Sequence, residues 1–174
     1  KKFIGNQFTV FGRALHFLCE NLVYDKVEDP EDFFNLSFEK ELDAIGLEED
    51  KLITEMREQA TLIAPQIIPQ LTKIFGEYEV FSVEERLYED ITDSETGYKF
   101  KGFIDLVIRT SDGKFHIIDW KTCSWGWDAK KRSDKYVTYQ LTLYKKFWCQ
   151  KYDVDPKLVE THFALLKRTA KKNN

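Results

Sequence analysis

The sequence predicts an α/β fold, in which a central mixed sheet is flanked by helices. Three observations predict it. Residues 8–24 and 48–75 are predicted to be helical, the pattern becomes strand-like over residues 78–122, and a further helix and strand follow. The expected sheet is an antiparallel three-strand meander plus a further strand. The 174 residues are long enough for one hydrophobic core and are expected to form a single domain.

The first predicted helix covers residues 8–24, where apolar side chains recur every three or four residues. Residues 25–47 are acidic and irregular, which predicts a loop with a short helix around Phe38–Ile45 that Gly46 ends.

Residues 48–75 are expected to be helical again. Pro65 and Pro69 should kink or divide this helix, and Gly76 should end it.

Three strands are expected next, at Tyr78–Ile91, Tyr98–Thr110 and Lys114–Thr122. The polar clusters at residues 92–97 and 111–113 between them are typical of turns.

A polar loop with tryptophans at residues 123–134 is predicted to lead into a helix at about 135–152. A last strand is expected at about 159–166, before a basic tail.

Charge is unevenly distributed along the chain. Residues 25–58 carry 13 acidic and 4 basic side chains, whereas residues 59–174 carry 16 acidic and 19 basic ones. The net charge of −4 argues against a generic nucleic-acid coat. An acidic helical insert at about 25–58 and a mildly basic remainder are compatible with local binding of a polyanion, and the insert is a candidate contact for a protein partner.

No apolar run approaches the length of a membrane span, so no membrane partner is expected. The three cysteines, Cys19, Cys123 and Cys149, are odd in number and scattered. This pattern favours reduced thiols in an intracellular protein, either cytoplasmic or the phage- or organelle-encoded equivalent.

The segment HIIDWKT, residues 116–122, carries two opposite charges on an otherwise apolar strand. Asp119 and Lys121 are two residues apart, so they point to the same side of the strand.

The preceding turn decides which residues face this pair. A two-residue loop at Asp112–Gly113 would place Asp105 opposite Trp120. A three-residue loop at Ser111–Gly113, closed by a left-handed glycine, would place Asp105 opposite Asp119. Glycine as the third loop residue favours the second form.

In that register two carboxylates oppose each other on one face of the sheet, which is destabilising unless they are neutralised. Lys121 supplies one positive charge. A divalent cation would supply the rest, and oxygen ligands suit Mg²⁺ or Mn²⁺. The alternatives are an isolated Asp119–Lys121 pair, or a register in which Asp105 is merely exposed.

His16 on the first helix is a further candidate ligand. Gly12 lies one turn before it and leaves the space beside it empty. Glycine inside a helix costs about 1 kcal/mol relative to alanine, which suggests a close approach at this point. A histidine packed into the core is the alternative.

Four segments, in order, resemble motifs of the PD-(D/E)XK nuclease superfamily and of its RecB-like exonuclease branch. GRALH (12–16) resembles the G-x-x-x-H motif, GFIDLVI (102–108) the G-x-x-D strand, IDWKT (118–122) the D-x-K motif and YQLTLY (139–144) the Q-x-x-x-Y helix. The resemblance covers roughly residues 8–166.

The resemblance implies a restriction-endonuclease-like core and a divalent-metal-dependent DNA nuclease, with roles in DNA repair or recombination. It implies that His16, Asp105 and Asp119 bind the metal, with the Trp120 carbonyl as an extra ligand. Lys121 would position or activate the attacking water, which makes Asp105, Asp119 and Lys121 the catalytic set. The expected activity is exonucleolytic, on single-stranded DNA or DNA ends.

Gln140 and Tyr144 lie one helical turn apart. The resemblance implies that they pack against the site and touch the nucleic-acid backbone. Plain helix packing is their alternative role.

The loop after the D-x-K strand contains aromatic and cationic residues. Such residues suit binding of single-stranded nucleic acid, because they offer stacking surfaces for bases beside contacts for phosphates. An ordinary solvated loop with a tryptophan anchor is the alternative. The residues are Trp125, Trp127, Lys130, Lys131 and Arg132.

The family often carries a glutamate on the strand before G-x-x-D, and Glu84 and Glu85 both compete for that place as an additional acid. Some relatives hold an iron–sulfur cluster on four cysteines. Three cysteines cannot repeat that arrangement, so no iron–sulfur cluster is expected. Alternative functions are a structure-specific endonuclease of the same superfamily, a non-catalytic nucleic-acid-binding module, and an α/β interaction domain.

Overall fold

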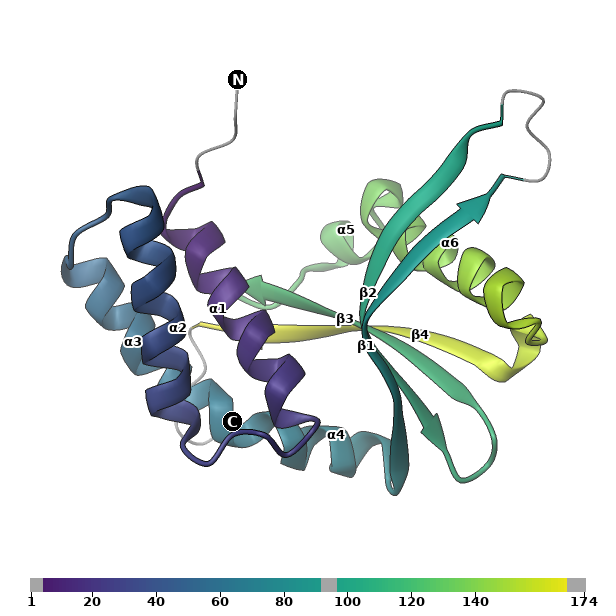
Figure 1. Cartoon of the computed structure of the whole chain (residues 1–174), viewed down its shortest axis with the longest axis horizontal. Helices are drawn as coiled ribbons and strands as arrows, with labels where there is room; N and C mark the ends of the chain where they lie inside the picture. The colour runs from purple at the N-terminus through teal and green to yellow at the C-terminus, as the bar shows by residue number, and fades with distance from the viewer. Residues whose placement is uncertain (1–4, 92–96, 169–174) are drawn as a thin grey trace. The chain divides into compact units, whose positions relative to one another are not determined.

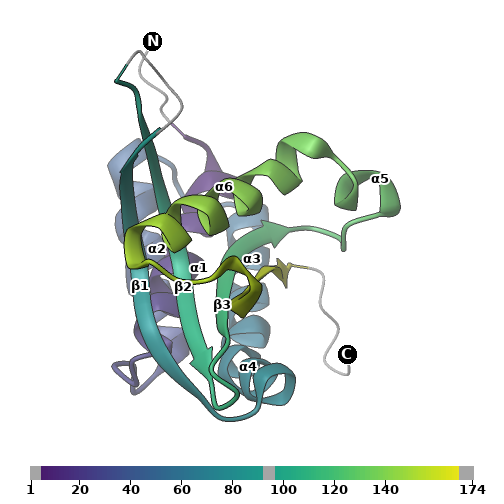
Figure 2. The same cartoon turned by 90° about the vertical axis from the view of Figure 1, so that its right-hand side faces the viewer.

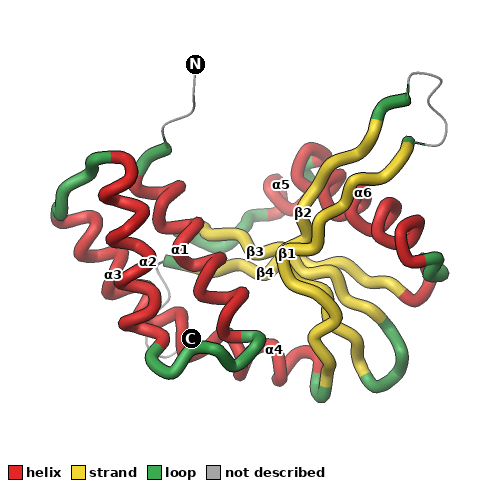
Figure 3. Tube along the Cα trace, in the orientation of Figure 1, coloured by secondary structure: helices red, strands yellow, loops and turns green. Residues whose placement is uncertain are grey.

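The computed structural model describes residues 5–91 and 97–168. Figures 1 and 3 show its helices and strands. The strands form one sheet in the order β1-β2-β3-β4. The α-helices are α1 (Gln7–Leu22), α2 (Pro30–Ile45), α3 (Lys51–Ile63), α4 (Ile67–Phe75), α5 (Ala129–Arg132) and α6 (Lys135–Tyr152). The strands are β1 (Tyr78–Asp90), β2 (Lys99–Thr110), β3 (Phe115–Cys123) and β4 (Val159–Lys167), and short 3₁₀ turns occupy Ala64–Gln66 and Pro156–Leu158.

The sheet is mixed. β1, β2 and β3 pair antiparallel in sequence order. Lys114 and His116 on β3 contact Glu160 and His162 on β4, so the partner numbers rise together and β4 runs parallel to β3. The predicted α/β class, with an antiparallel three-strand meander plus a further strand, is therefore confirmed.

The chain divides into two compact units. One, called here the helical unit, contains the described residues of 1–74, 121–126 and 165–174. The other, called the sheet unit, contains residues 75–120 and 127–164.

In the helical unit, α1, α2 and α3 lie side by side (Figure 1). Phe11 of α1 meets Phe34 and Phe38 of α2 edge to face, with ring centroids 5.6 and 5.8 Å apart. All three rings are almost fully buried, so this aromatic cluster is a main source of the unit's hydrophobic stabilisation.

The second helix is longer than the sequence predicts, because α2 begins at Pro30 and not near Phe38. The Asp29 side chain caps it, and proline at the first helical position needs no hydrogen-bond partner for its nitrogen. Gly46 ends the helix with φ of 67°, as predicted. The segment predicted to be mostly loop is therefore mostly helix.

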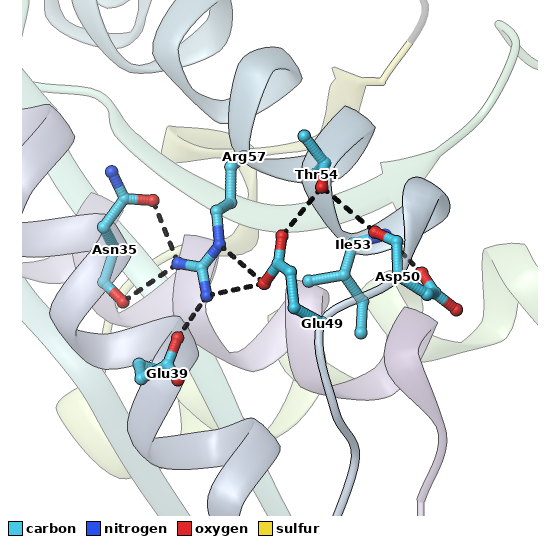
Figure 4. Close-up of polar contacts among 7 residues, drawn as sticks. All are labelled: Asn35, Glu39, Glu49, Asp50, Ile53, Thr54 and Arg57. Carbon is cyan, nitrogen blue, oxygen red and sulfur yellow. Dashed lines mark hydrogen bonds and ion pairs between the residues drawn. The ribbon is translucent and has the colours of Figure 1, made fainter.

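Arg57 of α3 ties this acidic segment together (Figure 4). Its guanidinium contacts the carboxylates of Glu39 and Glu49 and the side-chain and backbone oxygens of Asn35. One cation thus offsets two of the acidic charges of residues 25–58.

The prolines divide the next helix as predicted. α3 ends at Ile63, a 3₁₀ turn contains Pro65, and α4 begins at Ile67 with Pro69 in its first turn. Gly76 follows α4 with φ of 69°.

In the sheet unit, α6 lies across β1 and β2 (Figure 2). Phe147 of α6 stacks on Phe100 of β2 with ring centroids 4.3 Å apart. The fully buried Trp148 packs in the same core as Leu87 and Ile104. This core fixes the face of α6 that points to the sheet.

The predicted helix at 135–152 and strand at 159–166 are confirmed. The predicted loop at 123–134 contains α5, whose first turn is capped by Asp128, so that loop is more ordered than expected. Apart from Gly97, the predicted turn at 92–97 lies outside the described residues, as do residues 169–174 of the basic tail. Within residues 5–91 and 97–168, no helix is long and apolar enough to cross a membrane.

Candidate active site

The turn between β2 and β3 has three residues, Ser111–Gly113. Gly113 adopts φ of 83° and donates its N–H to the Thr110 carbonyl at 2.9 Å. Beyond the turn Leu106 pairs with Ile118, which is the register of the three-residue loop. The structure therefore confirms this alternative and excludes the two-residue loop.

Continued by one residue, this register places Asp105 on β2 opposite Asp119 on β3. Both residues are buried, with exposed fractions of 9% and 2%. The Trp120 backbone N–H donates to Asp105 Oδ2 at 2.6 Å. The sheet unit thus holds two neighbouring carboxylates away from bulk water.

Gln140 of α6 contacts one of these carboxylates, and Tyr144 of the same helix contacts Gln140. Gln140 Nε2 donates to Asp119 Oδ1 at 3.0 Å and to the Tyr144 hydroxyl at 3.0 Å. Burial raises the pKa of Tyr144, and the hydrogen bond from Gln140 lowers it. The nearby charges of Asp119 and Asp105 raise it again, so the pKa lies above its ordinary value. Tyr144 is therefore a neutral hydroxyl at physiological pH.

Gly102 allows Tyr144 to lie close to β2. A Cβ at this position would stand 2.8 Å from Tyr144 Cε1 and 3.0 Å from Phe100 Cε1, closer than packed carbons approach. The glycine of the segment GFID is therefore explained by the ring that packs on it.

In the helical unit, Gly12 of α1 has a comparable role. A Cβ on it would lie 3.3 Å from the side-chain oxygen of Thr122, at the end of β3. The expected close approach is thus made by Thr122. His16 lies one turn further along α1 and is half-buried.

β3 carries the remaining predicted residues of the metal and catalytic sets. Trp120 is 4% exposed, and its N–H is engaged by Asp105. Lys121 is half-buried and lies two residues after Asp119 in the strand. Because side chains alternate along a strand, Asp119 and Lys121 point to the same side of β3.

The two glutamates of β1 have different surroundings. Glu85 contacts Lys151 Nζ and accepts a hydrogen bond from the Tyr152 hydroxyl at 2.8 Å. Burial alone raises the pKa of Glu85, but the hydrogen bonds from Lys151 and Tyr152 outweigh it and hold that pKa below its ordinary value. Glu85 is therefore part of an ion pair between β1 and α6.

Glu84 lies level with Asp105, because Val83 pairs with Leu106 and Glu85 with Ile104. It is exposed, and its φ of 49° is unusual for a residue other than glycine. Such a backbone costs about 1–3 kcal/mol and is found more often at functional sites than elsewhere.

The loop after β3 offers exposed aromatic and cationic groups. Trp125 is 74% exposed, and Lys130, Lys131 and Arg132 are all exposed on α5. Trp127, in contrast, packs on a strand, with its ring 4.9 Å from that of Phe163 in β4. Trp127 is thus the anchor of the loop.

The first turns of α6 present two aromatic rings that the sequence analysis did not single out. Tyr136 is 92% exposed and Tyr139 is 54% exposed. Both follow the cations of α5 in the chain and are further surfaces on which bases could stack. Helical periodicity placed them on a helix, but the exposed face became clear only from the packing of α6.

The donor set fits a divalent metal ion. Asp105 and Asp119 present carboxylate oxygens from neighbouring strands, and hard cations such as Mg²⁺ prefer oxygen ligands. A bound cation would also offset the repulsion between the two buried charges.

The sequence matches the family model of the PD-(D/E)XK nuclease superfamily over residues 5–173, nearly its whole length. None of the curated proteins compared with it matches. Members of this superfamily are metal-dependent nucleases, and the mixed sheet with its helices has their restriction-endonuclease-like fold. This chain therefore belongs to the PD-(D/E)XK nuclease superfamily.

Proposed function

We propose that this chain is a Mg²⁺- or Mn²⁺-dependent deoxyribonuclease of the RecB-like branch that acts as an exonuclease on single-stranded DNA or DNA ends. The observation that carries the proposal is the hydrogen bond from Gln140 to Asp119, with Tyr144 as the second partner of Gln140. It links the Q-x-x-x-Y helix to a buried pair of carboxylates.

Asp105 and Asp119 would hold the cation, and the Trp120 carbonyl and His16 are the proposed further ligands. When bound, the cation would supply an activated water and stabilise charge on the phosphate oxygens. Lys121 places a positive charge beside the scissile phosphate and positions the attacking water. Gln140 restrains the carboxylate of Asp119.

Glu84 is the proposed additional acid. Glu84 is exposed and lies level with Asp105, whereas Glu85 lies level with Ile104, so Glu84 is the better candidate.

A single-stranded substrate is supported by the exposed groups after β3. Trp125 offers a face for base stacking, and Lys130, Lys131 and Arg132 offer charges to phosphates. These three cations add positive charge at an exposed segment, which favours binding of a phosphate backbone.

We further propose that residues 1–174 act as one nuclease domain. The acidic helical segment 25–58 would repel DNA phosphates, so it suits contact with a protein partner. A DNA substrate and three free thiols suit an enzyme that works inside a cell.

The proposal is tested with linear and covalently closed circular single-stranded DNA, each incubated with Mg²⁺, Mn²⁺ or chelator. We expect degradation of the linear strand, abolished by chelator, while the circle stays intact. Labels at the 5′ or 3′ end then give the direction of digestion. Cleavage of the circle would instead indicate an endonuclease, and binding without cleavage under every metal condition would indicate a non-catalytic module.

A further inference from the structure

A second group of metal-ligating side chains lies between β3 and β4 in the sheet unit. His116 Nδ1 is 3.0 Å from His162 Nε2 and 3.9 Å from Glu160 Oε2. Among the described residues, these three are the group whose potential ligand atoms all lie within 4.8 Å of one another. The chain has three histidines, and two of them meet here.

The hydrogen bonds around His116 determine which of its nitrogens can bind a cation. Thr110 Oγ1 lies 2.6 Å from Asp112 Oδ1 and 3.2 Å from His116 Nε2. A carboxylate only accepts, so the single hydroxyl hydrogen of Thr110 goes to Asp112, its nearest acceptor. Thr110 Oγ1 therefore accepts from His116 Nε2–H, and the lone pair of Nδ1 faces His162.

This arrangement matches metal-binding histidines. In these, one ring nitrogen binds the metal, and the N–H of the other donates a hydrogen bond to an outer partner. Without metal, His162 Nε2–H donates to His116 Nδ1. A bound cation would take the place of that hydrogen, and the proton would move to His162 Nδ1, which keeps the ring neutral.

The surroundings favour neutral imidazoles beside a carboxylate. Phe75 packs against both rings, at 4.9 Å from His116 and 5.2 Å from His162. Burial lowers the pKa of both histidines, so both are neutral ligands near pH 7. Glu160 is 44% exposed at its side chain, which gives a cation a route in from solvent.

Lys114 does not fill the site. It binds Glu160 Oε1 at 2.7 Å, while Oε2 is the oxygen closer to His116. The charged side chains that act on His116 are two carboxylates, Glu160 and Asp112, and the ammonium group of Lys114. Their net negative charge favours binding of a cation.

We propose that His116, His162 and Glu160 form a binding site for a zinc-type transition-metal ion that clips β4 to β3. Zinc–nitrogen bonds of about 2.0–2.1 Å place two ligand nitrogens of a tetrahedral site about 3.3 Å apart, so the histidines need to separate by only a few tenths of an ångström. Two imidazoles and one carboxylate favour zinc over Mg²⁺, and a water would complete the tetrahedron. His116 and Asp119 are three residues apart in β3, so their side chains point to opposite faces, and this site is separate from the proposed nuclease site.

The test uses the full-length chain with Asp105→Asn and Asp119→Asn together, which removes the carboxylates proposed for the nuclease metal. Zinc stoichiometry is measured by equilibrium dialysis, and Co²⁺ serves as a probe through its tetrahedral absorption bands. We expect one equivalent of zinc, an intense Co²⁺ spectrum and a higher Tm with zinc.

His162→Gln and Glu160→Gln are added separately to this background, with Glu58→Gln, at an exposed position of α3, as the matched control. Loss of an outer partner alone weakens metal binding about 10–100-fold, so loss of His162 should weaken it by at least about 100-fold. Glu58→Gln should bind zinc unchanged. Glu160 is partly exposed, so its variant reports on binding even if His162→Gln folds poorly. The proposal is overturned if the background variant binds no zinc, or if Glu160→Gln and His162→Gln bind it as tightly as Glu58→Gln does.

Discussion

Gln140 donates hydrogen bonds to Asp119 Oδ1 and to the Tyr144 hydroxyl, each at 3.0 Å, and so joins α6 to the buried end of β3. Since an amide carries one pair of N–H donors, both are aimed by the same terminal group. Asp119 is thereby held in one orientation before any metal binds.

Replacing Gln140 with leucine should therefore weaken the response of cleavage to metal more than it lowers the stability of the fold. We expect the Mg²⁺ concentration for half-maximal cleavage to rise about 10–100-fold, the usual effect of losing an outer partner of a metal ligand. Gln150→Leu on the same helix is the control, because Gln150 bonds to the Asp90 carbonyl on β1. Equal Mg²⁺ dependence in the two variants would contradict the role of Gln140.

Gly102→Ala should destabilise the protein by about 1–3 kcal/mol, the usual cost of overpacking. The new methyl group would stand 2.8 Å from the Tyr144 ring. Urea unfolding gives the free energy, with Gly126→Ala as the control, since the nearest atom to its Cβ would be Lys167 Cδ at 3.9 Å. Adding Tyr144→Leu should recover part of the loss; no recovery would mean that the ring is not the cause.

Glu84 and Glu85 should respond in opposite ways to substitution by glutamine. Glu85→Gln removes the charge that Lys151 binds and should lower the free energy of unfolding by about 1.5–3 kcal/mol. Glu84→Gln should retain stability and lose activity. A stable Glu85→Gln protein with low activity would reverse the assignment.

The stabilisation from Glu85 should also depend on pH. Its pKa in the folded protein is lowered, so the contribution is complete above the pKa of an unfolded glutamate, about 4.3, and is lost as the pH falls through the lower folded value. The stability difference between wild type and Glu85→Gln should shrink between about pH 5 and pH 3. Urea unfolding across that range checks it, and a constant difference would argue against the ion pair.

Combined substitution of Lys130, Lys131 and Arg132 by alanine should weaken binding of single-stranded DNA. It should also make that binding less dependent on salt concentration. Each lost phosphate contact lowers the slope of log K against log salt by about 0.7, so the slope should fall by about 2. Trp125→Ala should weaken binding with little change in slope, because stacking releases no counterions. A triple variant with the wild-type slope would place the DNA elsewhere.

Local sequence predicted the parts of the site that depend on one turn or one strand. Gly113 at the third position of its loop predicted the register, and the register brought Asp105 opposite Asp119. The start of α2 differs from the sequence prediction. Asp29–Pro30 is a helix-start signal, but the acidic composition of the segment predicts a loop.

Other features depend on partners far apart in the chain. Glu85 differs from Glu84 because it pairs with Lys151 on α6. Position 102 requires glycine because the ring of Tyr144, also on α6, packs against it. His116 and His162 are 46 residues apart and meet only because β4 pairs parallel to β3. No pattern in neighbouring residues carries this information.

The central claim is metal-dependent hydrolysis of DNA at Asp119 and Lys121. The most direct measurement is single-turnover cleavage of end-labelled single-stranded DNA in Mg²⁺ by wild type, Asp119→Ala and Lys121→Ala, purified identically and matched in Tm. We predict chelator-sensitive cleavage by wild type and rates at least about 100–1,000-fold lower in both variants, the scale of losing one electrostatic group from an active site. Equal cleavage by all three proteins would contradict the account.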